Sequence, residues 1–347
     1  MTENQQIEII YPEDELLIVY PQEQYEWKLI STNHNVFQII NKENKEDLIF
    51  IKELFINDKT ITECRQIYKE IYLLINLASY DYFSKKVSFK FNIDKNYIFT
   101  FANENKISLS NLIDSQNFNI LENKQLIQWI IYQITFGLYT LHSNNVIHHD
   151  IKPSNILING EGGISIIDFG SAIFKGEKSY DFTLSYAAPE LLLNYDYKID
   201  EKIDIWGLGV IMLELLLKHN KLFYNEDITG PTDQLNYILP KFGINSNNPI
   251  KYLKKELKDN KNIKFKIEKE ILDKIDDKNA VDLIINLLSF DPKERKSAKE
   301  ILESDYLKDF KGCDDFEIKL INFPKDYELI SPDINQENFI NLLEKIK

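Results

Sequence analysis

The run that most constrains this chain is His148–Asn155 (HHDIKPSN), which is followed thirteen residues later by Asp168-Phe169-Gly170. It places two carboxylates, an amide and an ammonium group on two segments that are close in the sequence. Seven specified residues, at roughly 5% frequency each, match a given start by chance on the order of once in 10^9. This set of groups is what the transfer of a metal-bound phosphoryl group requires. The chain must therefore fold so that the two segments become neighbouring loops.

These residues resemble the catalytic loop and the metal-binding loop of eukaryotic protein kinases, and Lys152 followed by Pro153 is typical of the serine/threonine kinases. The resemblance covers roughly residues 25 to 310. It implies an α+β, bilobal kinase fold, in which a small lobe with a five-stranded antiparallel sheet and one helix precedes a mostly helical large lobe. It also implies ATP as the phosphate donor and Mg2+ as the cofactor.

Asp150 and Lys152 are the candidate catalytic residues. A hydroxyl nucleophile needs a positioned carboxylate that orients it and accepts its proton, and this is the role implied for Asp150. Lys152 can offset the charge that builds up on the phosphoryl oxygens. Taken alone, Asp150 would more often be a turn or capping residue, and Lys152 a solvated surface residue.

Asn155 and Asp168 are the candidate metal ligands. Mg2+ prefers oxygen donors and usually takes only one or two of them from the protein, so one amide oxygen and one carboxylate suffice. We expect Gly170 to allow the turn that presents Asp168. An Asp-Phe-Gly turn is common at protein surfaces, but downstream of Asp150 and Asn155 it indicates a magnesium site.

Lys52 and Glu70 are the candidate anchors of the nucleotide phosphates. Lys52 ends the strand-like run Leu48–Lys52, and Glu70 begins a Glu-Ile-x-x-Leu-x-x-Leu pattern on a predicted helix. The resemblance implies an ion pair that fixes the ammonium group against the phosphates. The alternative is a purely structural pair, with Lys52 on an edge strand.

The resemblance also places Ile30, Val36, Phe101 and Asn103 in the nucleotide-binding site. The residue that controls access to this site is either Thr100 or Phe101, because the alignment of this predicted strand slips by one position.

The turn between the first two predicted strands departs from the family. Where the family has a Gly-x-Gly-x-x-Gly loop, residues 30–36 (ISTNHNV) contain no glycine. Backbone N–H groups approach phosphate most closely where no Cβ intervenes, although Asn and His also adopt positive φ. Loss of one such donor typically costs ~10^2–10^3 in rate, so the loop is compatible with a slow kinase and equally with an inactive one.

Four further segments resemble parts of the large lobe. Thr183–Glu190 resembles the substrate-docking loop, Asp204–Gly209 the start of the central helix, and Asp291–Arg295 a late turn whose Arg295 pairs with Glu190. That buried pair would lock the docking loop rather than take part in the chemistry. Leu222–Gly243 resembles the group that contains the cyclin-dependent and mitogen-activated kinases.

Three substitutions bear on regulation and substrate choice. His149 replaces an Arg that receives the activation-loop phosphate in many kinases, and neutral His receives phosphate poorly. Lys178 occupies the position of the usual phosphorylated Thr. We therefore expect a charge-paired or intrinsically ordered loop that does not depend on phosphorylation there. Ala187 replaces an Arg of the cyclin-dependent and mitogen-activated kinases, which argues against a proline-directed substrate.

Hydrophobic periodicity predicts the secondary structure. Strands are predicted over residues 27–32, 36–41, 48–54, 87–93 and 97–102, with an additional hairpin of 7–11 and 16–20. Helices are predicted over 60–78, 127–141, 203–217, 280–288 and 297–302, the first of them capped by Asp58 or Thr60. The predicted domains are an N-terminal extension (1–24), the small lobe (25–103), the large lobe (104–310) and a C-terminal tail (311–347) with an amphipathic run over 339–343.

The composition is that of an ordinary globular protein, with 44% hydrophobic residues and a formal net charge of −14. The negative charge disfavours nucleic acid or an anionic membrane as the main partner. We find no signal-peptide pattern and no run of the ~18 apolar residues that a membrane span needs, and the two cysteines fit a reducing compartment. We expect a cytoplasmic protein, with the nucleus as the alternative location, that acts on protein substrates and has a regulatory protein partner.

Three functions stay open at this point: a serine/threonine kinase, a pseudokinase that serves as a binding or scaffold module, and a structural component of a larger assembly. The glycine-free loop favours the second. The first is favoured because clustered carboxylates are costly without a cation to meet them, and all six polar residues of the pattern are present: Lys52, Glu70, Asp150, Lys152, Asn155 and Asp168. The sequence does not name the substrate, the regulator or the oligomeric state.

Overall fold

The computed structural model describes residues 24–31, 36–44, 48–55, 60–80, 82–84, 87–92, 97–103, 107–115, 121–193, 199–219, 221–244, 267–313, 338–339 and 341. The chain divides into two compact units, one formed by residues 1–105 and 323–347 and the other by residues 106–322. The predicted hairpin of 7–20 lies outside the described residues, as does most of the predicted amphipathic run in the tail. Phe339 of that run is buried.

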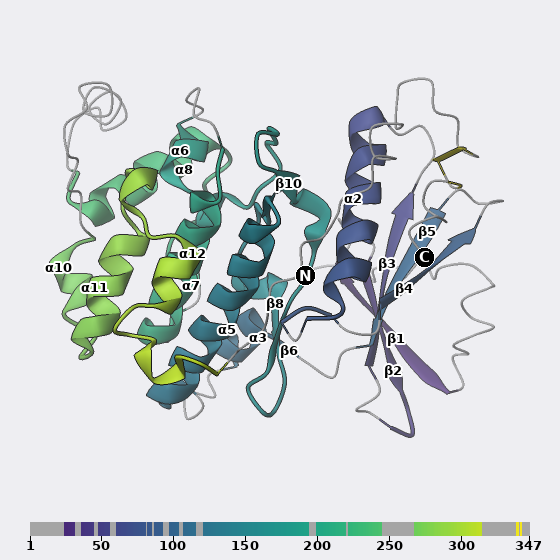
Figure 1. Ribbon diagram of the computed structural model, residues 1–347, viewed down its shortest axis with the longest axis horizontal. Coiled ribbons are helices and arrows are strands. Elements are labelled where there is room, and N and C mark those ends of the chain that lie inside the picture. Colours follow the sequence, from purple (N-terminus) through teal and green to yellow (C-terminus); the bar gives the residue numbers. More distant parts are fainter. Residues whose placement is uncertain are drawn as a thin grey trace, which may run out of the picture. The chain divides into compact units, whose positions relative to one another are not determined.

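The first unit contains an antiparallel sheet of five strands in the order β1-β2-β3-β5-β4, which confirms the predicted small-lobe sheet (Figure 1). The strands are β1 (Tyr25–Ser31), β2 (Val36–Asn41), β3 (Leu48–Phe55), β4 (Val87–Asn92) and β5 (Tyr97–Asn103). In the middle of the sheet, Lys52 of β3 pairs with Val36 of β2 on one side and with Thr100 of β5 on the other. The candidate phosphate anchor therefore lies on a central strand, not on an edge strand.

Helix α2 (Ile61–Leu77) packs beside this sheet and contacts β4. Its N-terminus is a capping box, in which Thr60 accepts from the backbone of Glu63 and the Glu63 side chain accepts from the backbone of Thr60. Of the two predicted caps, Thr60 is therefore the observed one, and Asp58 lies outside the described residues. Cys64, Ile67 and Ile71 of the predicted apolar stripe are buried.

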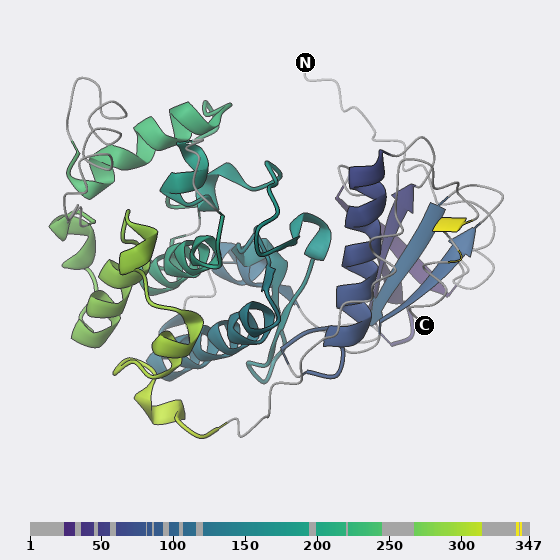
Figure 2. The ribbon, with the colours of Figure 1, turned by 45° about the horizontal axis from the view of Figure 1, so that its top comes forward.

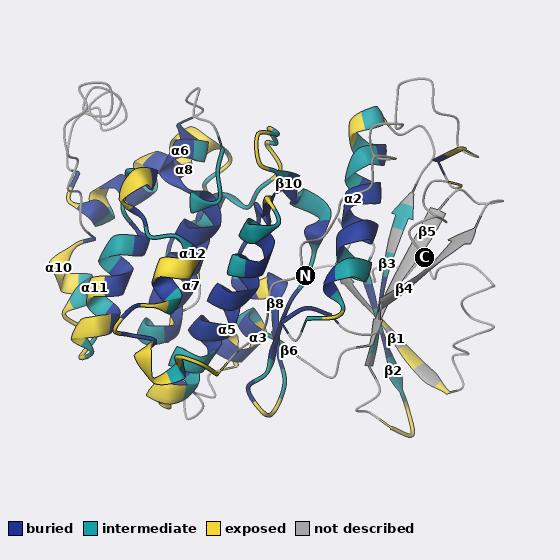
Figure 3. Ribbon diagram, viewed as in Figure 1, coloured by how far each residue is buried: buried dark blue, intermediate teal, exposed yellow. Residues whose placement is uncertain are grey.

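The second unit is mostly helical and is built around α7 (Lys202–Leu217), which contacts α5 (Lys124–Ser143) and α11 (Lys278–Leu287) (Figure 1; Figure 2). Every residue of α7 from Ile203 to Leu215 is buried, as expected for a helix that is apolar on nearly all sides (Figure 3). The other helices with described bounds are α3 (Leu109–Asp114), α6 (Pro189–Leu192), α8 (Pro231–Ile238), α10 (Lys269–Leu272) and α12 (Ala298–Leu302).

Two pairs of very short strands position the candidate loops in this unit. Strand β7 (Val146–Ile147) pairs with β10 (Ile173–Phe174), and β8 (Ile156–Ile158) pairs with β9 (Ile164–Ile166) and with β6 (Ile107–Ser108). Residues 148–155 thus connect β7 to β8, and residues 167–172 connect β9 to β10. Each loop begins in one of the pairs β7–β10 and β8–β9 and ends in the other. The two loops therefore lie side by side.

Among the residues that the structure describes, none of the helices combines the length and apolarity that a membrane crossing needs.

Gly207 is required where α7 meets the catalytic loop. A Cβ at this position would lie 2.7 Å from the backbone oxygen of Ile151, closer than real Cβ contacts come. In Gly207→Ala the better helix propensity contributes about 1 kcal/mol, but overpacking against a backbone typically costs about 1–3 kcal/mol. We expect a net loss of stability, measured as a lower midpoint of thermal unfolding. In the control Gly160→Ala the new Cβ has no atom within 4 Å, and a variant of Gly207 as stable as this control would contradict the prediction.

Candidate active site

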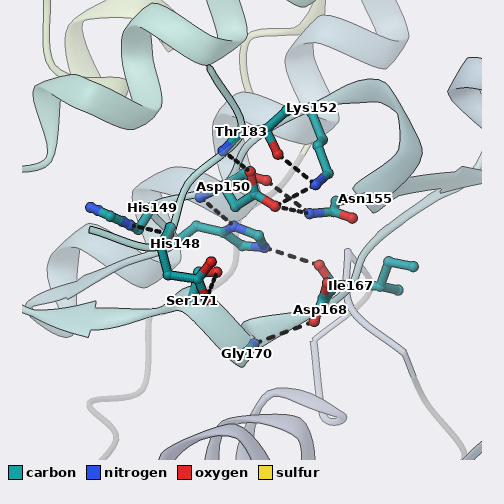
Figure 4. Close-up of polar contacts among 11 residues, drawn as sticks. His148, His149, Asp150, Lys152, Asn155, Ile167, Asp168, Gly170, Ser171 and Thr183 are labelled. Carbon is teal, nitrogen blue, oxygen red and sulfur yellow. Dashed lines mark hydrogen bonds and ion pairs between the residues drawn. The ribbon is translucent and has the colours of Figure 1, made fainter. Parts of the chain in front are cut away.

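Asp150 is held by three donors that come from two segments of the second unit (Figure 4). Its Oδ2 lies 2.6 Å from Lys152 Nζ and accepts a hydrogen bond of 3.1 Å from Asn155 Nδ2. Its Oδ1 accepts a hydrogen bond of 3.1 Å from the backbone N–H of Thr183. The carboxylate is therefore buried and fixed in orientation.

Lys152 lies beside Asp150 in the same loop. Its ammonium group also donates to Thr183 Oγ1, at 2.7 Å. Thr183 thus contacts Asp150 through its backbone and Lys152 through its side chain. This double contact joins the catalytic loop to the start of the predicted substrate-docking loop.

Asn155 and Asp168 are brought together through the backbone. The N–H of Ile167 donates to the backbone oxygen of Asn155 at 3.0 Å, directly before Asp168. The side-chain nitrogen of Asn155 donates to the backbone oxygen and to Oδ2 of Asp150. Its Oδ1 accepts no hydrogen bond within the described part of the chain, which leaves this oxygen available to a cation.

The turn that presents Asp168 has its left-handed residue at Asp168 and not at Gly170. The residue in the left-handed region is Asp168 itself, with φ of 64°, whereas Gly170 lies in a 3-10 turn with ordinary φ (Phe169–Ser171). Asp168 Oδ1 accepts from the backbone N–H of Gly170 at 3.4 Å. An Asp can adopt positive φ because its short side chain can bond locally to the backbone, so the strain falls on the presumed ligand and not on the glycine.

The donors of Asn155 and Asp168, one amide oxygen and one carboxylate, fit Mg2+, which retains water and phosphate oxygens as its other ligands. The described residues contain no group of three or more His, Cys, Asp or Glu side chains that could hold a metal ion.

His148 ties the two loops to each other. Its Nε2 lies 3.0 Å from the backbone oxygen of Ile167, which can only accept, so Nε2 carries the hydrogen. Its Nδ1 is then the acceptor for the backbone N–H of Asp150, at 3.4 Å. The ring also contacts that of Phe169, with centroids 5.3 Å apart.

Asp204 at the start of α7 holds the backbone of the catalytic loop. The sequence alone does not predict this role. Its Oδ2 accepts from the backbone of His148 and from His142 Nε2, and its Oδ1 accepts from the backbone of His149, all at 2.9 Å. Burial alone would raise the pKa of this carboxyl, but the hydrogen bond and charge of His142, with the other donors, hold it below its ordinary value. The available signal was an acid in the first turn of a helix that is almost entirely apolar.

Glu190 and Arg295 form the buried pair that the sequence predicts. Arg295 Nη1 and Nη2 donate to the two carboxylate oxygens at 2.7 and 2.8 Å. Arg295 also donates to the backbone oxygens of Ser289 and Lys202. The pair therefore joins the docking loop to α7 and to the turn before α12.

In the first unit, Lys52 Nζ lies 2.5 Å from Glu70 Oε1, so the predicted ion pair is present. Val36 lies opposite Lys52 in the sheet. By their backbones Ile30 lies in β1 and Phe101 and Asn103 lie in β5.

The side chains of Ile30, Thr100, Phe101 and Asn103, and the glycine-free residues 32–35, are outside the described part of the structure. Their roles in a nucleotide site therefore stay predictions, and so does the choice between Thr100 and Phe101. The residues near Asp150 and the Lys52–Glu70 pair belong to different units, and each group is described within its own unit.

A model of the protein kinase domain matches residues 32–307. The chain belongs to the protein kinase family. The two loops of the second unit and the Lys52–Glu70 pair all lie within the matched part of this kinase domain.

Curated relatives carry mitogen-activated kinase names. The chain is 36% identical over 199 residues to mitogen-activated protein kinase HOG1 of Colletotrichum orbiculare, a match that covers 53% of this chain and 52% of that protein. It is 37% identical over 198 residues to HOG1 of Gibberella zeae and 36% identical over 199 residues to hog-1 of Neurospora crassa, with the same coverage. The predicted resemblance to this kinase group is confirmed, and the chain spans about half the length of the curated relatives it matches.

Helix α7 carries a second buried acid, Glu214, which holds the docking loop. It accepts hydrogen bonds from the Tyr186 hydroxyl at 3.1 Å and from the backbone of Leu222 at 2.8 Å. Burial raises the pKa of Glu214 to about 7, against the lowering effect of these donors. Burial, with the charge of Glu214, also raises the pKa of Tyr186. The carboxyl therefore titrates near neutral pH.

Stability should depend on pH through Glu214. Its pKa is raised on folding, so its favourable contribution is complete below about pH 4.5 and is lost as the pH rises through about 7. Glu214→Gln keeps an acceptor for Leu222 and cannot ionise, so at pH 8 we expect it to exceed the wild type in unfolding free energy by up to about 3 kcal/mol. Denaturant unfolding between pH 5 and 8 measures this difference, with Glu226→Gln at an exposed position as the control. A pH dependence unchanged in Glu214→Gln would contradict the prediction.

Proposed function

We propose that this protein is a protein kinase that transfers the γ-phosphate of ATP to serine or threonine hydroxyls of protein substrates. The observation that carries the proposal is the Asp150 carboxylate, oriented by Lys152, Asn155 and the Thr183 backbone. A purely structural role does not need an acidic side chain whose orientation is fixed in this way, whereas a group that accepts a hydroxyl proton does.

Asn155 and Asp168 would hold Mg2+, which supplies neutralisation of the phosphate oxygens when it is bound. Asp150 would orient the substrate hydroxyl and accept its proton at the carboxylate. Lys152 would offset the charge that develops on the transferred group. In the first unit, Lys52, fixed by Glu70, would hold the other phosphates of the nucleotide.

The substrate hydroxyl would approach from the side of the docking loop. A small hollow lies against Asp150 there, and Phe182, Thr183, Tyr186 and Ala187 are among the residues that line it. We infer from the resemblance and the charge that the substrates and a regulatory partner are proteins, and that the protein acts in the cytoplasm or the nucleus.

Phosphate transfer tests the proposal. With Mg2+-ATP and a generic basic protein as acceptor, we expect transfer to serine or threonine and a fall in kcat of about 10^2-fold or more in Asp150→Asn, because the catalytic base is lost. Asp273→Asn, at an exposed position, is the control and should keep the wild-type rate. Equal kcat in Asp150→Asn and the control would contradict the proposed role of Asp150.

Nucleotide binding separates a kinase or pseudokinase from a purely structural component. Mg2+-ATP at about 1,000 times its dissociation constant should stabilise the folded chain by about 4 kcal/mol, which raises the midpoint of thermal unfolding. The shift should shrink in Lys52→Met, which removes the ammonium group that Glu70 fixes. No shift in the wild type would indicate the structural component, and a shift without phosphate transfer would indicate the pseudokinase.

A further inference from the structure

His149 lies between α7 and the segment that follows the second loop. Its backbone N–H donates to Asp204. Its ring nitrogen Nδ1 lies 3.0 Å from the backbone oxygen of Asp181, and its ring meets the Phe182 ring edge to face, with centroids 5.8 Å apart. The side chain thus contacts two consecutive residues that directly precede Thr183.

The contact with Asp181 fixes the state of the imidazole. A backbone oxygen can only accept, so Nδ1 carries the hydrogen and donates it. Nε2 is buried and, within the described part of the chain, has no hydrogen-bond partner. In the neutral ring Nε2 is an unused lone pair, but in the cation it would be a buried, charged N–H without an acceptor, which is far more costly.

The surrounding charges do not reverse this preference. The acids that face the ring are Asp204 of α7, Asp150 of the catalytic loop and Asp181 of the bound segment, and all three favour the cation. Burial outweighs them, so the pKa of His149 is lowered from its ordinary value. The ring is therefore neutral at pH 7.

The contact between His149 and Asp181 is linked to the catalytic carboxylate of Asp150 by a short stretch of backbone. His149 holds the Asp181 oxygen, and two residues later the Thr183 N–H donates to Asp150 Oδ1 while its hydroxyl accepts from Lys152. His149 also has a φ of 70°, a left-handed backbone conformation that His adopts more readily than most other residues.

We propose that neutral His149 is a positioning residue that holds residues 181–183 against Asp150, and that its protonation releases this segment and lowers phosphate transfer. The contact between His149 and Asp181 holds residues 181–183 in place without a phosphate group. The effect on phosphate transfer rests on the proposed function, whereas the positioning of residues 181–183 does not.

The two parts are tested separately in the full chain. Hydrogen exchange of backbone amides in residues 179–186, corrected for the intrinsic rate at each pH, reports the segment without any need for activity. In His149→Leu the donor is lost, and we expect protection to fall about 5-fold at pH 7.5, as for the loss of one net hydrogen bond. In His149→Asn the amide nitrogen can replace Nδ1, and Asn also tolerates positive φ, so protection should be retained.

The pH dependence gives the second readout. Burial against residues 181–183 lowers the pKa of His149. The contact is therefore complete above about pH 6.5, the ordinary pKa of His, and is lost as the pH falls below that value. We therefore expect wild-type protection and kcat to fall together as the pH drops below about 6.5, and the same fall to be absent in His149→Asn. Ser179→Ala removes a different contact of Asp181, to its backbone N–H, and serves as the control that should keep the acid-dependent fall.

Wild-type protection in His149→Leu at pH 7.5, with unfolding midpoints equal to within a few degrees, would overturn the positioning role. An unchanged acid-dependent loss of protection in His149→Asn would overturn the role of protonation. If the wild type transfers no phosphate but the exchange results are as expected, the proposed function fails and the positioning role stands.

Discussion

The buried carboxylate of Asp204 is the interaction on which the arrangement of the catalytic loop depends. It accepts from two consecutive backbone N–H groups, those of His148 and His149, and from the imidazole of His142. Without it, two backbone donors and a histidine would be buried without partners, at a cost of about 1–3 kcal/mol each. Because Asp204 belongs to the buried stretch of α7, Ile203 to Leu215, the loop is attached to the core of its unit.

From this attachment the polar groups extend outward in a connected series. The His148 ring donates to the backbone oxygen of Ile167 in the second loop, and the His149 ring donates to that of Asp181. Asp150, the next residue, accepts from its three donors, one of which is the Thr183 N–H. In such a network each member fixes its neighbours, so one displaced residue disturbs the whole set. The candidate metal ligand Asn155 has two roles. Its amide nitrogen orients Asp150, and its amide oxygen stays available to a cation.

The long elements and the chemical residues could be predicted from the sequence, because both leave strong local signals. Helix α2 and strand β2 follow directly from their periodicity, and Lys52–Glu70 and Glu190–Arg295 follow from family motifs. Strands β6 to β10 could not be predicted, since segments of two or three residues show no periodicity and form only through their partners in the fold. The role of Asp204 and the positive φ of Asp168 depend on contacts between distant residues, which a single sequence does not display.

Amide hydrogen exchange at His148 and His149 measures whether Asp204 holds the catalytic loop by its backbone. We expect these two amides to be among the slowest to exchange in the wild type. In Asp204→Asn, where one oxygen becomes a donor, they should exchange at least about 10-fold faster relative to the amides in the middle of α7. Unchanged protection at His148 and His149 in this variant would mean that Asp204 does not hold the loop.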